Sequence, residues 1–179
     1  MVLLRTNEIM ETDSELCNFI VSNMPYLEEV TWQTEDGSLN NKFKELTDLA
    51  DKYNVRQNII THLLFVDEDL INKINDYSIN LQVTIDAVDK KTYEEIRVGS
   101  KYENLLEKLE ALKKLRSKNK KFEYGMQSVI VSKNYERLDD MIKFAIFYNF
   151  DRISFLKYVS VQKDDLSLSE QQKTEVFNK

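Results

Sequence analysis

Short apolar segments alternate with amphipathic segments along most of this chain, and the alternation limits the folds that it can form. Segments of strand length, rich in β-branched and aromatic residues, are separated by segments with apolar residues at helical spacing. Parallel pairing through right-handed crossovers is the usual result of this order. We therefore predict an α/β fold with a parallel sheet of about five strands and outer helices, either doubly wound or part of a β/α barrel. The predicted strands are residues 27–34, 56–65, 79–87, 121–132 and 151–160, and the predicted helices are residues 13–24, 40–53, 67–77, 91–97, 102–119 and 135–149, with a further helix begun in 161–179.

Composition narrows the class of protein further. The chain has 179 residues, 42% of them apolar, which is enough for one domain with a substantial core, so we expect a single domain over residues 1–179. A net charge of −6 argues against a nucleic-acid surface. No apolar run approaches the roughly 18 residues of a membrane span, and the first residues lack a signal-peptide pattern. With one cysteine there is no internal disulfide, and we expect a cytoplasmic protein.

The carboxyl ends of the predicted strands should carry the function, and the segment "VTIDAVD" is the most informative of them. Thr84 and Asp86 share one face of their strand because side chains alternate with period two. A hydroxyl and a carboxylate at this spacing can bind a diol such as a ribose. The alternative is that Asp86 caps the next helix and that Thr84 merely suits a strand.

Other charged residues near strand ends admit two interpretations each. Arg97 can hold a ligand carboxylate bidentately, or it can pair with Glu94 or Glu95 on its own helix. Glu35 and Asp36 follow the first predicted strand and can receive an ammonium group, or they can form an acidic turn before a glycine.

Two reactive side chains occur once each in the chain. His62 ends a predicted strand on the presumed functional side, where it is either an acid–base group or a polar loop residue, but it cannot form a metal site alone. Cys17 lies on the apolar stripe of its helix, which favours a core position.

Residues 81–116 resemble the middle of radical S-adenosylmethionine (SAM) enzymes, in the branch that often carries a C-terminal auxiliary-cluster domain. The similar motifs are a strand ending Thr84–Ile85–Asp86–Ala87, the segment from Tyr93 to Arg97, and a helix opened by Gly99–Ser100–Lys101–Tyr102–Glu103. The resemblance covers residues 26–158 in the family's order of elements. It implies a partial (β/α)6 barrel, similar to a truncated TIM barrel, with strands two to six present here.

The resemblance also implies cofactors and their contacts. S-adenosylmethionine would meet Thr84 and Asp86 at its ribose, Arg97 at its carboxylate, and Glu35 and Asp36 near its amino group. The family's [4Fe–4S] cluster needs a Cys-x-x-x-Cys-x-x-Cys segment in the loop after the first strand, whereas this chain has a single cysteine. The Gly-Gly-Glu segment of the family is also lost, since it aligns with residues 34–36.

Three functions remain open from the sequence. The chain is a core excerpt of a radical SAM enzyme that modifies peptides, proteins or small molecules and is inactive alone, or it is a degenerate, non-catalytic barrel that binds a peptide or nucleoside. A weaker alternative is an unrelated β/α sugar-phosphate enzyme, although none of its loops is glycine-rich. Strand residues 29–33 would form an open edge, which predicts self-association there or a cover made by residues 1–12.

Overall fold

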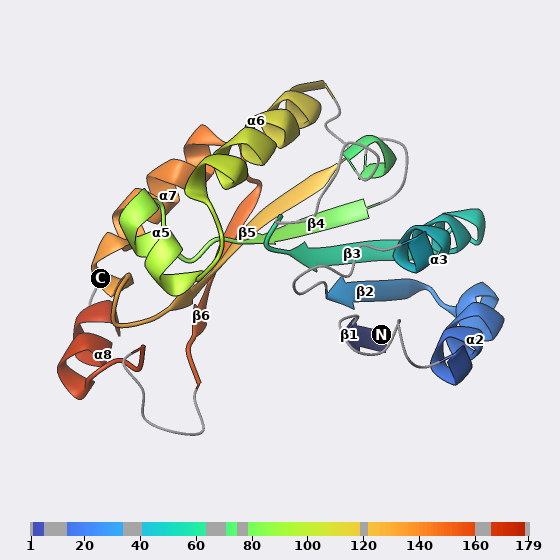
Figure 1. The fold of residues 1–179 in the computed structure, drawn as a ribbon, viewed down its shortest axis with the longest axis horizontal. Coiled ribbons are helices and arrows are strands. Elements are labelled where there is room, and N and C mark those ends of the chain that lie inside the picture. The colour runs from blue at the N-terminus through green and yellow to red at the C-terminus, as the bar shows by residue number, and fades with distance from the viewer. Residues whose placement is uncertain are drawn as a thin grey trace.

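The computed structural model describes residues 2–5, 14–33, 41–63, 71–74, 79–118, 122–159 and 166–177, and these ranges contain one six-stranded parallel sheet. The strands follow one another across the sheet in chain order (Figure 1). This confirms the predicted α/β fold, including the parallel pairing between the strands that begin at Ile79 and Glu123. The strands are β1 (Val2–Arg5), β2 (Glu29–Gln33), β3 (Arg56–Thr61), β4 (Ile79–Thr84), β5 (Glu123–Ile130) and β6 (Arg152–Lys157).

The helices connect these strands close to the predicted positions. None of the described helices is long and apolar enough to span a membrane. Residues 71–74 are helical and fall inside the predicted helix 67–77, whose other residues lie outside the described ranges. The helical elements are α2 (Ser14–Asn23), η1 (Met24–Tyr26), α3 (Asn41–Lys52), α5 (Lys90–Ile96), α6 (Tyr102–Lys118), η2 (Tyr135–Arg137), α7 (Leu138–Phe147) and α8 (Glu170–Phe177).

Burial alternates along β3 and β4 and separates a helix-covered face from a polar face. Val30, Trp32, Ile59, Leu81 and Val83 are completely buried on the first face. The residues between them on β3 and β4 are polar or only half-buried. Because alternate strand residues point to opposite faces, the apolar core lies between the sheet and the helices, and the other face is left polar.

The buried side chain of Gln57 connects β2 and β3 to α3 by hydrogen bonds. The side chain of Gln57 accepts a hydrogen bond from Trp32 Nε1 at 3.0 Å and donates one to the Thr47 carbonyl at 3.1 Å. It therefore joins β2, β3 and α3 inside the core, where an unpaired amide would be costly.

The structure corrects the strand count at the N-terminal side. β1 pairs in parallel with β2, from Val2 opposite Val30 to Arg5 opposite Gln33. The resemblance implied strands two to six, and β1 adds a strand before them. Four residues are too few to show a strand periodicity in the sequence. The alternative cover is confirmed for residues 2–5, which pair with β2, so β2 is not an edge strand of the described sheet. Self-association stays a prediction.

Candidate functional site

Asp86 lies just after β4 and is the centre of a buried polar network. Its Oδ1 accepts a hydrogen bond from the Val129 backbone N–H at 2.8 Å. Its Oδ2 accepts from Arg97 Nε at 2.8 Å and also from Arg97 Nη2. The Asp86 side chain is 4% exposed and that of Arg97 is 24% exposed. Both carboxylate oxygens are thus engaged within the protein.

Asn134 belongs to the same network and was not identified from the sequence. Its Nδ2 donates to the Asp86 carbonyl at 2.7 Å and to the Val129 carbonyl at 2.8 Å. Its Oδ1 accepts from the Val131 N–H at 2.8 Å, and the residue is 1% exposed. The only sequence signal was a polar residue in the turn after a predicted strand. Asn134 links the carboxyl ends of β4 and β5.

Arg97 follows α5 and turns back to the carboxyl edge of the sheet. It pairs with Asp86 rather than with Glu94 or Glu95, and its Nη1 lies 3.0 Å from His62 Nε2. A guanidinium can only donate, so the His62 ring nitrogen accepts this hydrogen bond. His62 thus joins the residues predicted for the site.

The structure also rules out the alternative role of Asp86 as the cap of the next helix. The residue that caps α5 is Asp89, whose Oδ1 accepts from the Thr92 N–H at 3.0 Å. Asp86 is therefore not the helix cap, because the chain needs three more residues to reach the start of the helix. Thr84 is 4% exposed and lies opposite Gln127 of β5.

Three further residues from the sequence analysis lie away from this network or outside the described residues. Cys17 is 6% exposed and belongs to the core, as predicted. Glu35 and Asp36 lie outside the described residues.

A tyrosine holds the loop that carries Asp86 and Asp89. The Tyr102 hydroxyl donates to the Val88 carbonyl at 2.6 Å. Burial is the main cause that raises the pKa of Tyr102 to about 12, with smaller contributions from Tyr148 and Asp89. The phenol therefore stays protonated, and able to donate, throughout the neutral pH range.

These residues do not fit the cofactors that the resemblance implied. The Asp86 carboxylate is 4% exposed and already accepts from Val129 and Arg97, and Arg97 already donates to Asp86 and His62, so neither group is presented free to a ligand. A [4Fe–4S] cluster needs at least three thiolates, whereas the chain has Cys17 alone, buried in the core. Residues 6–13, which follow β1, contain no cysteine.

The polar face carries a groove of about 410 Å³ that crosses five strands from β2 to β6. Its centre is neutral and rich in amides: Asn80 Nδ2 donates to Asn58 Oδ1 at 2.9 Å, and Asn58 Nδ2 donates to Thr31 Oγ1 at 3.4 Å. We call it the polar groove; it is lined by Glu29, Thr31, Asn58, Ile60, Asn80, Gln82, Gln127, Arg152, Ser154 and Leu156.

Gly125 on β5 lies beneath two side chains that line the groove, those of Gln82 and Arg152. A Cβ at this position would meet Gln82 Oε1 at 2.4 Å and Arg152 Nε at 3.0 Å. The glycine therefore lets these two groove side chains cross the strand close to its backbone.

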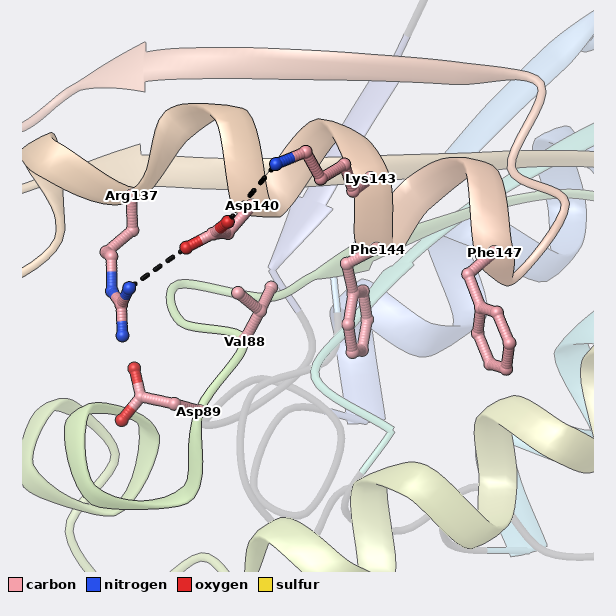
Figure 2. A pocket seen from close by; sticks show the side chains of 7 residues that line it. All are labelled: Val88, Asp89, Arg137, Asp140, Lys143, Phe144 and Phe147. Carbon is pink, nitrogen blue, oxygen red and sulfur yellow. Dashed lines mark hydrogen bonds and ion pairs between the residues drawn. The ribbon is translucent and has the colours of Figure 1, made fainter.

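A second cavity, of about 360 Å³, lies between α7 and the loop after β4. Figure 2 shows Arg137 and Lys143 both reaching Asp140, and Phe144 and Phe147 projecting from the same helix. The Arg137–Asp140 distance is 3.0 Å and both side chains are about half exposed, as their 54% and 42% exposures show. Exposed pairs of this kind contribute little, so this cavity is a weaker candidate than the polar groove.

Comparison with known proteins identifies the fold. No family model and no curated protein sequence matches the chain. Streptococcus suis SuiB is similar in structure at a TM-score of 0.70 and 13% identity, over 89% of this chain and 38% of SuiB. The enzyme anSMEcpe, solved with AdoMet and the Cp18Cys peptide, gives 0.68 and 15%, over 92% of this chain and 49% of that one.

A more distant similarity points to the same general architecture. The active domain 2 of a chitinase from Pyrococcus furiosus gives a TM-score of 0.55 at 11% identity, over 99% of this chain and 71% of that chain. The chain spans less than half the length of SuiB and anSMEcpe. At these identities the similarity shows the fold alone, which is the partial barrel of radical SAM proteins.

Proposed function

We propose that this chain is a peptide-binding barrel with the radical SAM fold that does not itself carry out radical chemistry. The observation that carries the proposal is the polar groove, which crosses five strands and is lined by side-chain amides from the three central ones, β3, β4 and β5. This corresponds to the degenerate, non-catalytic alternative rather than to an excerpt of an active core.

The groove suits a peptide because its amides match peptide groups. Each Asn or Gln side chain has two N–H donors and a carbonyl acceptor, so Asn80, Gln82 and Gln127 can bond both sides of a peptide unit. Support also comes from the neighbours: SuiB was solved with the precursor peptide SuiA, and anSMEcpe with Cp18Cys.

The absence of radical chemistry rests on the residues at the carboxyl edge. Asp86 and Arg97 bond one another instead of presenting a free carboxylate and a free guanidinium. The thiol count adds to this, since one cysteine cannot replace the three that bind a cluster.

Display selection with a random linear peptide library tests the binding function. We expect enriched peptides to bind the wild type and to bind Gln82→Ala about tenfold more weakly, since two hydrogen bonds of about 0.7 kcal/mol each are lost. Gln171→Ala is the matched control, because it removes an exposed amide on α8, far from the groove residues in the chain, and should leave affinity unchanged. No enrichment, or equal affinity for wild type and Gln82→Ala, overturns the proposal.

Anaerobic iron–sulfur reconstitution tests the second part of the proposal, that the chain does not carry out radical chemistry. We expect a colourless protein with iron well below four atoms per chain and no 5′-deoxyadenosine when S-adenosylmethionine and a reductant are added. The competing function, a working radical SAM core, is favoured by the similarity over about nine-tenths of the chain. A stoichiometric cluster together with 5′-deoxyadenosine would establish that function and refute ours.

A further inference from the structure

We infer that the polar groove selects peptides by charge, favouring a segment with a basic side chain at one end and an acidic side chain at the other. The inference rests on the proposed peptide-binding function and names the ligand class more closely. Glu29 on β2 and Arg152 on β6 line the groove on its two outermost strands. The residues between them on β3, β4 and β5 are uncharged.

Both charged residues can exchange their present partners for a ligand. Glu29 lies 3.2 Å from Arg56, with side chains 30% and 60% exposed. Arg152 lies 2.8 Å from Glu123, with side chains 43% and 59% exposed. Exposed ion pairs of this kind are worth about 1 kcal/mol or less, so a charged ligand group can replace either partner at low cost.

The span between the two charges fixes the length of the ligand. Four intervals between neighbouring strands, at about 4.8 Å each, separate β2 from β6 by roughly 19 Å along the sheet. Arg152 also lies four residues, or roughly 13 Å, further along the strands than Glu29, so the two charges are about 23 Å apart. An extended peptide advances about 3.3 Å per residue, so roughly six residues with long side chains at both ends can reach both charges. The paired residues place Arg152 level with Gln33 at the carboxyl end of β2, whereas Glu29 begins that strand, so the peptide should cross the sheet obliquely.

The neutral centre explains why the ends dominate selectivity. Asn58 and Asn80 already bond each other and Thr31, which holds them in place while leaving donor and acceptor capacity free. Amides of this kind bind any peptide backbone alike. Discrimination between peptides by charge must therefore come from Glu29 and Arg152, the two charged residues that line the groove.

Titration of blocked hexapeptides followed by NMR chemical shifts tests the inference. The probes share the centre Ala-Ser-Ala-Ser and carry Lys and Glu, Lys and Lys, Glu and Glu, or Gln and Gln at their ends. We expect the Lys/Glu peptide to bind the wild type about three- to tenfold more tightly than the Gln/Gln peptide, from two exposed pairs. Glu29→Lys should transfer the preference to the Glu/Glu peptide, and Arg152→Glu should transfer it to the Lys/Lys peptide.

A control variant distinguishes the effect of a charge inside the groove from the effect of the protein's net charge on peptide binding. Glu28→Lys makes the same charge change on the neighbouring, exposed residue, which does not line the groove, and should keep the Lys/Glu preference. If Glu29→Lys does not fold, as judged by circular dichroism, Glu29→Gln should reduce the preference for the Lys/Glu peptide over the Gln/Gln peptide to that of a single exposed pair, about threefold or less. Equal binding of all four peptides to the wild type overturns the charge selection but leaves peptide binding intact. No binding of any peptide at millimolar concentration overturns both.

Discussion

Replacing Asp86 by alanine is expected to lower the free energy of unfolding by about 3–5 kcal/mol, the range for breaking a buried ion pair from one side. The change removes both acceptor oxygens from a side chain that is 4% exposed. It leaves the Val129 N–H without its acceptor and the Arg97 guanidinium without its counter-ion. Because Arg97 is 24% exposed, water can solvate part of its charge after the substitution. The loss of unfolding free energy should therefore be close to about 3 kcal/mol.

Urea unfolding measures this loss, and Asp140→Ala is its matched control. Asp140 also pairs with an arginine, at 3.0 Å, but it is 42% exposed, so its removal should cost about 0.5 kcal/mol or less. Asp86→Asn should fall between the two, because its side-chain oxygen can still accept from the Val129 N–H. Equal midpoints for Asp86→Ala and Asp140→Ala would contradict the buried network.

The second large effect is expected at Asn134. Asn134→Ala removes three hydrogen bonds of about 1 kcal/mol each, and its 1% exposure leaves no room for water to replace them. We expect a loss of about 3 kcal/mol, together with faster amide exchange at Val131. Asn23→Ala is the control, since it removes a single exposed bond to the Phe19 carbonyl and should cost less than about 1 kcal/mol.

A double-mutant cycle checks that Asn134 and Asp86 act together. The Asp86 side chain accepts from the Val129 N–H and Asn134 Nδ2 donates to the Val129 carbonyl, so the two side chains are coupled through Val129. The bond from Asn134 to the Asp86 backbone carbonyl remains in Asp86→Ala. Residues in one network show coupling energies of about 0.5–3 kcal/mol, so the double variant should lose less than the sum of the single losses. Strict additivity would show that the two residues stabilise the sheet edge independently.

The fold was largely predictable because it depends on local patterns. Alternating burial on β3 and β4 follows directly from the order of polar and apolar residues in their sequences. β1 was missed because a single apolar run of three residues has no period. Its pairing with β2 depends on a contact between Val2 and Val30, far apart in the chain.

The candidate site was predictable only in part. The resemblance predicted that Asp86 and Arg97 belong to one site, but it did not predict the ion pair between them. That pair depends on how the chain folds in three dimensions, which local sequence patterns do not give. Asn134 is 48 residues from Asp86 and carries no periodic signal. The polar groove, in contrast, was implicit in the sequence, since Asn80 and Gln82 share the strand face of Thr84.

The strictly sequential order of the sheet has a consequence for how the protein is made. Among the described residues, each strand pairs only with the strands before and after it in the chain, and the longest interval between partners is that from Asn80 to Glu123. A growing chain therefore never has to wait for its last strand to complete an earlier pair, unlike a sheet in which a late strand inserts between early ones. Since chains emerge from the ribosome at about 5–20 residues per second, slower than local structure forms, the sheet can be built one strand at a time during translation.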